Sequence, residues 1–197
     1  MTRVAIIDNG GANIASLRFA LDRLGASSEL TRDPDALLRA PRVILPGVGA
    51  AADAMARLQA LGLVDVIRAL RQPVLGICLG MQLLFEASEE GDTTCLGIIP
   101  ARIARFADRA GLPVPHMGWN RVHATGAASW AGLEESPYMY FVHSYAAPVG
   151  PWTTATSDYG GEFSAMVRQR NFFGAQFHPE RSSRAGSRLL AEFLELA

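Results

Sequence analysis

Short strand-forming segments and amphipathic stretches alternate along the first half of this 197-residue chain. Strands are predicted at residues 4–7, 28–31, 43–45 and 74–77. Between the first two, Ile14, Leu17, Leu21 and Leu24 fall at helical spacing before Gly25. Further helices are predicted at 36–40 and, with a break near Gly62, at 50–71. Buried strands separated by helices indicate a parallel sheet covered by helices on both faces.

The pattern changes after Cys95, where short strands largely replace the helices. Strands are predicted at residues 96–99, 101–106, 138–142, 153–157, 162–168 and 172–177, with hairpin turns at 158–161 and 169–171. A final amphipathic helix at 184–196 would turn Leu189, Leu190, Phe193 and Leu194 inward. We therefore predict an α/β fold: a mostly parallel central sheet flanked by helices, with an antiparallel β extension in the C-terminal half. Residues 1–197 should form a single domain.

Composition and charge narrow the functional classes. With 49% hydrophobic residues, 19% charged residues and a net charge of −1, the chain shows no electrostatic signature of binding to nucleic acid or an anionic membrane. The sequence has neither the pattern of a signal peptide nor an apolar run long enough to span a membrane, so a cytoplasmic location is expected. In that reducing compartment Cys78 should be a free thiol, and Cys95 an incidental loop residue.

Cys78 stands where a buried strand is predicted to run into a helix at 81–87. Gly76 and Gly80 flank it at two residues on either side, which permits the sharp strand-to-helix turn that exposes a nucleophile in serine hydrolases. A thiol at a helix N-terminus is favoured as thiolate. The alternative is a cysteine packed as a small apolar residue.

A second candidate group lies about 100 residues later, at His178 and Glu180. Pro179 between them biases His178 toward an extended conformation, so both side chains can point to the same side. Glu180 could then orient the imidazole. A thiolate, an imidazole and an orienting acceptor are the components of a cysteine-based acyl-transfer site.

Two segments, Gly-Ile-Cys-Leu-Gly-Met-Gln at 76–82 and Gln-Phe-His-Pro-Glu at 176–180, closely resemble the class I, triad-type glutamine amidotransferases, whose fold is flavodoxin-like. Further segments resemble one branch of that family, the glutaminase subunits of imidazole glycerol phosphate synthase. These are residues 7–16, 46–50, 96–100, 116–120 and 140–145. The resemblance spans nearly the whole chain. It implies that Cys78 is the nucleophile, His178 the general acid/base and Glu180 its orienter, in a glutaminase that acts in histidine biosynthesis.

The resemblance also implies the surrounding site. The Leu79 amide and an amide of Val48 or Gly49 would form the oxyanion hole. The glutamine would be bound by Gln82, His143, Ser144 and Tyr145. Polar residues at those positions would otherwise be turn or surface residues. Neither a metal-ligand spacing nor a phosphate-binding P-loop occurs, and no cofactor is expected.

The partner implied by the resemblance is the cyclase subunit, which is a (β/α)₈ barrel that would receive ammonia in a heterodimer. Asn13, Arg18, Trp119 and Asn120 are the expected interface residues, although Trp119 and Asn120 would also suit packing at the edge of the core. We expect the 46–49 loop to be misoriented in the isolated chain and turned by the partner. Asn9, Ala12 and Ala101 depart from the family's usual Tyr, Gly and Gly, which leaves the local loop shape open.

Three other functions fit parts of this pattern. A glutaminase subunit for anthranilate, aminodeoxychorismate or pyridoxal phosphate synthesis would share the triad, but the segments at 46–49 and 116–120 argue against it. A non-catalytic scaffold on the same fold would have no reason to keep Cys78, His178 and Glu180 together. A cysteine hydrolase or peptidase would need an open substrate groove.

Overall fold

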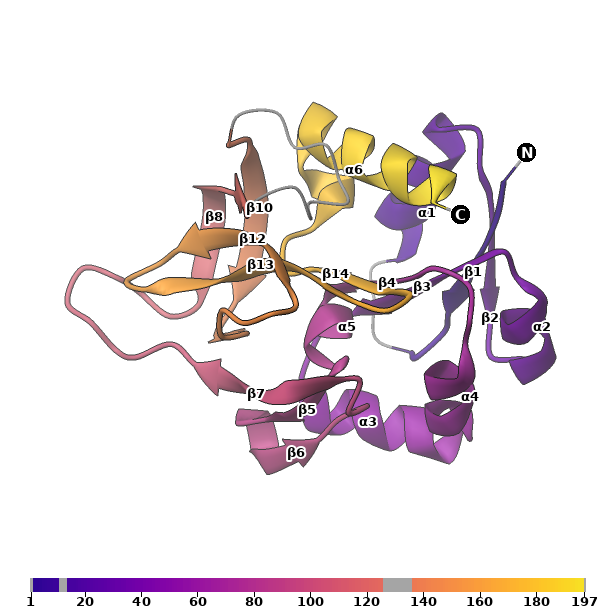
Figure 1. The fold of residues 1–197 in the computed structure, drawn as a ribbon, viewed down its shortest axis with the longest axis horizontal. Coiled ribbons are helices and arrows are strands. Elements are labelled where there is room, and N and C mark those ends of the chain that lie inside the picture. The colour runs from indigo at the N-terminus through magenta and orange to yellow at the C-terminus, as the bar shows by residue number, and fades with distance from the viewer. Residues whose placement is uncertain (1, 11–13, 126–135, 197) are drawn as a thin grey trace.

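The computed structural model describes residues 2–10, 14–125 and 136–196. Its main sheet has eight strands in the order β2-β1-β3-β4-β14-β13-β12-β9 (Figure 1). These strands are β1 (Arg3–Ile7), β2 (Ser27–Thr31), β3 (Arg42–Gly47), β4 (Val74–Cys78), β9 (His123–Ala124), β12 (Thr153–Asp158), β13 (Glu162–Gln169) and β14 (Phe172–Ala175). The pairs from β2 to β14 are parallel, and β13, β12 and β9 continue the sheet in antiparallel pairing. The predicted mixed architecture is therefore confirmed.

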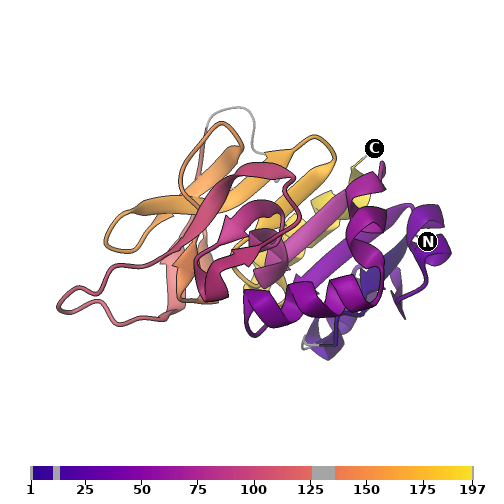
Figure 2. The same cartoon turned by 90° about the horizontal axis from the view of Figure 1, so that it is seen from below.

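Helices cover both faces of this sheet, as Figures 1 and 2 show. The helices are α1 (Ile14–Arg23), α2 (Pro34–Arg39), α3 (Ala51–Ala60), α4 (Leu63–Ala69), α5 (Leu79–Gln82) and α6 (Ser183–Glu195), with short 3₁₀ turns η1 (Glu90–Asp92) and η3 (Pro179–Arg181). Helices α1 and α6 bury Leu21 and Leu190 in one apolar cluster, whereas α2, α3 and α4 bury Leu37, Leu58 and Ile67 in another. The parallel strands thus have buried residues on both sides, which explains their continuous apolar pattern. Among the described residues, none of the helices has the length and apolar character needed to cross a bilayer.

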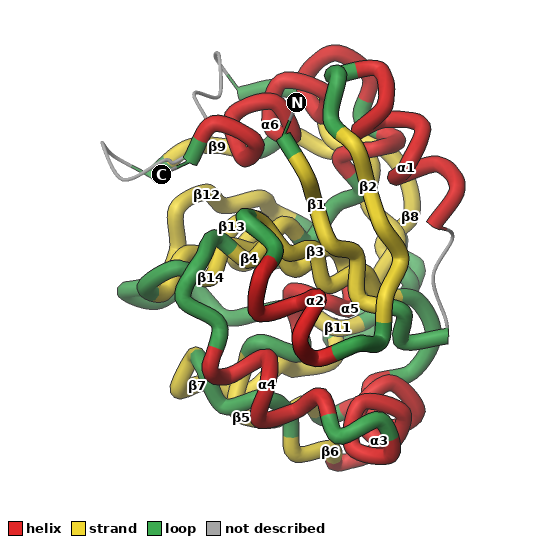
Figure 3. The backbone as a smooth tube through the Cα atoms, turned by 90° about the vertical axis from the view of Figure 1, so that its right-hand side faces the viewer, coloured by secondary structure: helices red, strands yellow, loops and turns green. Residues whose placement is uncertain are grey.

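Two smaller sheets complete the fold (Figure 3). One contains β11 (Tyr145–Ala146), β7 (Ile99–Arg105), β5 (Phe85–Ser88) and β6 (Thr93–Thr94). The other is an antiparallel pair of β8 (His116–Arg121) and β10 (Tyr138–His143). The sequence patterns did not predict strands at 116–121 or 123–124, because neither segment contains an apolar run. Only His116 is buried in the first segment, and both residues of the second are exposed.

The helix predicted at 81–87 is wrong, because α5 ends at Gln82 and residues 85–88 form a strand. The carbonyl groups of Leu83, Leu84 and Phe85 accept hydrogen bonds from the amides of residues 96–99. Those bonds replace the helical ladder, so tertiary pairing overrides the helix propensity of the segment. For the same reason the strand predicted at 96–99 is wrong over residues 96–98, whose amides bond back to this corner.

Cys95 is a second correction, since its side chain is 1% exposed and lies in the second apolar cluster. Burial raises the pKa of this thiol to about 11; the charge of Arg102 opposes this effect, and that of Glu90 adds to it. Cys95 is therefore a core residue held in its thiol form, not an incidental loop residue.

Candidate active site

The turn at Cys78 depends on glycines that bring two backbones into contact. A Cβ on Gly80 would lie 1.8 Å from the Leu45 carbonyl oxygen, and one on Gly76 would lie 2.6 Å from the Gly80 oxygen. Only hydrogen atoms fit at these positions. The close approach of α5 to β3 and β4 leaves Cys78 with φ 53° and ψ −112°, a sparsely populated conformation for a residue with a side chain. The predicted strand-to-helix corner is thus present and strained.

The short helix changes one part of the sequence argument. α5 has only four residues, so the effect of a long helix dipole on the thiol is small. The Cys78 sulfur instead lies near individual polar groups: it is 3.7 Å from the Val142 carbonyl oxygen, and the Gln176 side-chain amide donates to it at 3.9 Å. Local hydrogen bonds, not a macrodipole, define the environment of this sulfur.

His178 and Glu180 lie as the Pro179 argument predicts. His178 is extended, with φ −96° and ψ 98°, and its Nδ1 is 2.8 Å from a Glu180 carboxylate oxygen. The Cys78 side chain also acts on the imidazole, because it favours the charged form. Burial lowers the pKa of His178, but the hydrogen bonds and negative charges of Cys78 and Glu180 outweigh burial and raise it to about 10. The three side chains are therefore linked, and the charged imidazole is favoured.

Strand β10 contacts both Cys78 and the segment that carries His178 and Glu180. The Tyr140 carbonyl accepts the amide of His178, and the Tyr140 amide donates to the Ser182 hydroxyl, which in turn donates to the His178 carbonyl. The carbonyl of Val142, two residues further along β10, faces the Cys78 sulfur. One strand thus contacts both Cys78 and His178.

A cavity of about 410 Å³ opens beside the cysteine. Its walls include Cys78, His178 and Glu180, and the four residues of the loop from Pro46 to Gly49. Leu79, Gln82, His143, Ser144 and Tyr145 also line it, so the predicted oxyanion and glutamine-binding residues surround one space. Asp8, which follows the end of β1, pairs with Arg32 at 2.8 Å and does not line the cavity.

Two predicted binding side chains are engaged inside the protein. The Gln82 amide donates to the Tyr145 carbonyl at 2.8 Å and to the Gln176 side-chain oxygen at 2.9 Å. Both ring nitrogens of His143 contact protein atoms, the Tyr145 carbonyl at 2.8 Å and His116 at 3.0 Å. The His143 imidazole therefore has no free nitrogen for a ligand.

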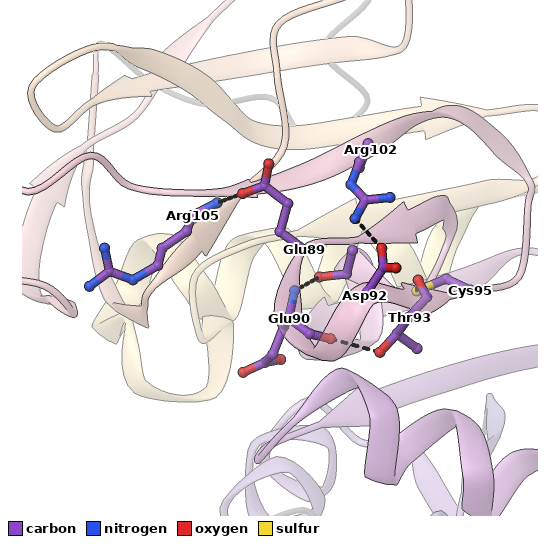
Figure 4. A network of polar contacts seen from close by, with 8 residues as sticks. Glu89, Glu90, Asp92, Thr93, Cys95, Arg102 and Arg105 are labelled. Carbon is purple, nitrogen blue, oxygen red and sulfur yellow. Dashed lines mark hydrogen bonds and ion pairs between the residues drawn. The ribbon is translucent and has the colours of Figure 1, made fainter.

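Sequence reasoning missed Glu90 and Gln176. Glu90 lines the cavity, and one of its carboxylate oxygens accepts the Ala51 amide at 2.7 Å. Figure 4 shows the network of residues 88–105 that fixes the backbone here: the Glu90 amide donates to the Ser88 hydroxyl, and its carbonyl accepts from Thr93. Glu90 lies in a polar stretch with no spacing signal. Gln176 lies two residues before His178 in the same motif, so in an extended segment both side chains point to the same side. That spacing could have marked Gln176 as a neighbour of Cys78.

The predicted interface residues divide between two faces. Trp119 is 53% exposed on the outer face of the β8–β10 pair, together with Met117 and Tyr138. Asn120 faces the other way and bonds within the chain to Asp158, Arg121 and His116. Arg18 is exposed on α1, and Asn13 lies outside the described residues.

Comparison with known proteins decides the family. The model of the family "Glutamine amidotransferase class-I" matches residues 5–196. The chain belongs to this family. "Imidazole glycerol phosphate synthase subunit HisH" of Xanthomonas axonopodis pv. citri is 54% identical over 198 residues, covering 100% of this chain and 99% of that protein. The protein of the same name from Idiomarina loihiensis is 54% identical over 193 residues, covering 98% and 97%.

Solved structures agree on the fold of this class I glutamine amidotransferase. The structure of PurLQS from Thermotoga maritima superposes with a TM-score of 0.76 at 19% identity, covering 98% of both chains. A glutamine amidotransferase from the same organism gives a TM-score of 0.68 at 18% identity, covering 98% of this chain and 83% of that one. At such identities these likenesses concern the fold alone.

Proposed function

We propose that this amidotransferase is the glutaminase subunit of imidazole glycerol phosphate synthase in histidine biosynthesis, and that Cys78, His178 and Glu180 are its catalytic triad. The main evidence for the triad is that the three side chains line one cavity, that His178 Nδ1 contacts the Glu180 carboxylate at 2.8 Å, and that Cys78 and Glu180 together raise the pKa of His178. The full-length identity of 54% to subunits named HisH supports the pathway. Residues 1–197 are taken as one glutamine amidotransferase domain.

In the proposed reaction the Cys78 thiolate attacks the side-chain carboxamide carbon of glutamine. The His178 imidazolium gives its proton to the leaving nitrogen, so ammonia departs and a glutamyl thioester remains. His178 then takes a proton from water as the water attacks the thioester. The C–S bond breaks, the Cys78 thiolate re-forms beside the imidazolium, and the product leaves as glutamate after its new carboxyl group loses a proton to solvent. Glu180 keeps the His178 ring oriented throughout, as the third member of the triad.

The oxyanion formed in each step needs two donors. The Leu79 amide begins α5 next to Cys78, and a Val48 or Gly49 amide would be the second donor. Loss of one such donor costs about 3 kcal/mol of transition-state stabilisation. Gly49 has φ +91°, a conformation suited to glycine, so the peptide before it has the freedom to turn. We propose that the partner turns this loop into its active orientation.

The cavity also suits the other end of the substrate. Glu90 offers a carboxylate at the cavity wall, which would attract the α-ammonium group of a free amino acid. Gln82, Ser144 and Tyr145 would complete the site through side-chain or main-chain atoms.

The proposed partner is the cyclase subunit, which is a (β/α)₈ barrel that receives the ammonia in a heterodimer. Its docking surface would include the outer face of the β8–β10 pair, where Met117, Trp119 and Tyr138 are each more than half exposed. Large exposed apolar side chains in one patch are typical of interface anchors. Because β10 also contacts Cys78 and His178, docking there would reach the triad directly.

The test is a glutaminase assay with and without the cyclase and its ribonucleotide ligand. Cys78→Ala should abolish activity, whereas Cys95→Ala, which removes the other free cysteine, should keep it. Activity that survives Cys78→Ala would refute the triad. A wild-type chain that is fully active alone would refute the partner-controlled loop. A chain that stays inactive when the cyclase and its ligand are added would refute the pathway.

A further inference from the structure

Two histidines that the proposed reaction does not use lie against each other beneath the β8–β10 pair. His116 Nδ1 is 3.0 Å from His143 Nε2, and the side chains are 3% and 5% exposed. They come from paired positions of the antiparallel strands, on the face opposite Trp119. A histidine pair so deeply buried needs a defined arrangement of protons, because one of the two facing nitrogens must donate and the other accept.

The contact with Tyr145 determines that arrangement. The Tyr145 carbonyl can only accept, so the proton of His143 is on Nδ1, which lies 2.8 Å from that oxygen. In the neutral ring Nε2 is then an acceptor. His116 must therefore donate from Nδ1, and its own Nε2 must accept.

The contact between Asn120 and His116 independently requires that His116 Nε2 accepts a hydrogen bond. Asn120 Nδ2 lies 2.8 Å from the Asp158 carbonyl oxygen and its Oδ1 accepts the Arg121 amide at 2.8 Å, so the orientation of the amide is fixed. Nδ2 is thus the atom that faces His116 Nε2, at 3.3 Å, and it donates. The contact with Tyr145 at one end of this series of hydrogen bonds and the contact with Asn120 at the other therefore require the same tautomer, with the proton on Nδ1, in both rings.

The series of hydrogen bonds continues from Tyr145 to Cys78 through the side chains of Gln82 and Gln176. The Tyr145 carbonyl accepts a second hydrogen bond, from Gln82 Nε2 at 2.8 Å. The other Gln82 proton goes to the Gln176 side-chain oxygen at 2.9 Å, which turns the Gln176 Nε2 toward the Cys78 sulfur at 3.9 Å. The orientation of the donor on the sulfur is therefore linked to the tautomers of the two histidines.

The surroundings keep both rings neutral. His116 stacks between Phe141 and Tyr159, with ring centroids 4.9 and 4.1 Å away. Burial lowers the pKa of His116 to about 4. Burial also lowers the pKa of His143, which the Tyr145 carbonyl raises and the charges of His116 and His178 lower further, to about 3.

We propose that Asn120, His116 and His143 are positioning residues of the glutaminase site: their single tautomer arrangement holds the Tyr145 carbonyl, and through it the glutamine side chains that direct a donor to Cys78. This inference rests on the proposed function, because it takes Cys78 as the nucleophile. It differs from a role in packing, since the direction of each hydrogen bond matters as well as the shape of each side chain.

The test replaces one amide by a carboxylate of the same shape. Asn120→Asp puts an acceptor opposite His116 Nε2, which draws a proton there and disrupts the bond to His143. We expect kcat for glutamine in the cyclase complex to fall about 10- to 100-fold, as for a small misplacement of reacting groups, with a smaller change in KM. His116→Phe keeps an aromatic ring in the stack but removes both bonds, and should lower kcat similarly. Asn171→Asp is the matched control, because the Asn171 amide likewise donates two hydrogen bonds, to the main-chain carbonyls of Leu70 and Gln72, but lies outside this series of bonds.

Nitrogen-15 NMR of the histidine rings gives a readout that packing would not change. Both His116 and His143 should be Nδ1–H neutral tautomers in the wild type, and Asn120→Asp should change the His116 signals. An Nε2–H tautomer or an imidazolium in either wild-type ring would overturn the proposal. So would wild-type kcat in Asn120→Asp, or a loss equal to that of Asn171→Asp. Failure of the proposed function is separate, since it would appear as glutaminase activity in Cys78→Ala whatever the tautomers.

Discussion

The side-chain amide of Asn9 donates a 2.8 Å hydrogen bond to the main-chain carbonyl of Pro46, the first residue of the proposed oxyanion loop. Asn9 is 2% exposed, and its own Oδ1 has no partner among the described residues. Asn9 is one of the residues at which the sequence departs from the pattern of the family that it resembles, so its contact with Pro46 bears on the shape of this loop. It anchors one end of the loop whose other end, at Gly49, has the freedom to turn.

Replacing Asn9 should loosen this loop. Asn9→Ala removes the bond and leaves a buried carbonyl without its donor, which should lower the free energy of unfolding by about 1–3 kcal/mol. A released loop would visit the active orientation without the partner, so glutaminase activity of the isolated chain should rise and the activation by the cyclase should shrink. Arg32→Gln is the control, because it breaks only the neighbouring exposed pair with Asp8. Unchanged activation by the cyclase in Asn9→Ala would show that the anchor has no such role.

Because the backbones approach so closely at the Cys78 corner, a side chain at Gly80 should strongly destabilise the fold. Gly80→Ala would put a methyl group 1.8 Å from the Leu45 carbonyl oxygen, and backbone on both sides cannot move aside cheaply. We expect a loss of about 3 kcal/mol or more in the free energy of unfolding, measured by urea denaturation. Gly161→Ala meets nothing within 4 Å and should stay within about 0.5 kcal/mol of wild type. Equal stability of the two variants would mean that the close approach is not a constraint.

Glu180 should control the titration of His178. The folded pKa of about 10 lies above the ordinary 6.5, so this stabilisation is complete below pH 6.5 and is lost as pH rises toward 10. In that window the wild type should lose up to about 1.4 kcal/mol of unfolding free energy per pH unit from this group. Glu180→Gln removes one negative charge, so the pKa of His178 should fall and the window should narrow; His178→Gln should remove this component of the slope. An NMR titration of His178 checks the shift, and an unchanged pKa in Glu180→Gln would contradict it.

The strands and helices that the sequence predicted well are those with a local signal. Helix α1 and helix α6 show apolar residues at helical spacing, and α2 has a local N-cap, in which the Asp33 side chain accepts from the Asp35 amide. The corner at Cys78 was predictable because the two glycines are needed for it locally. The sequence motif likewise predicted the His178–Glu180 contact, since only Pro179 separates the two residues.

The parts that failed depend on distant partners. Residues 85–88 have helix-forming composition but pair with β7 and β6, and Cys95 sits in a polar stretch yet is buried by that same sheet. The pairing of His116 with His143 arises from the register of β8 against β10, and no spacing rule relates residues 27 positions apart. Long-range register thus determines the features of the site that the sequence alone did not indicate.

The buried histidines should make the fold sensitive to acid. Because burial lowers the pKa values of His116 and His143 to about 4 and 3, the unfolded chain binds protons at these residues below pH 6.5 while the folded chain does not. Their stabilisation is therefore present above pH 6.5 and is lost as pH falls through 6.5 toward 4. Each ring should contribute a slope of up to about 1.4 kcal/mol per pH unit, measured by urea denaturation between pH 7.5 and pH 4.5.

His116→Phe should remove about half of this pH-dependent component of the unfolding free energy. Met139→Leu, a volume-conserving change at a fully buried residue of β10, should lower stability by less than about 1.5 kcal/mol and keep the wild-type slope. If His116→Phe kept the full slope, His116 would not be the neutral buried ring on which the chain of hydrogen bonds depends.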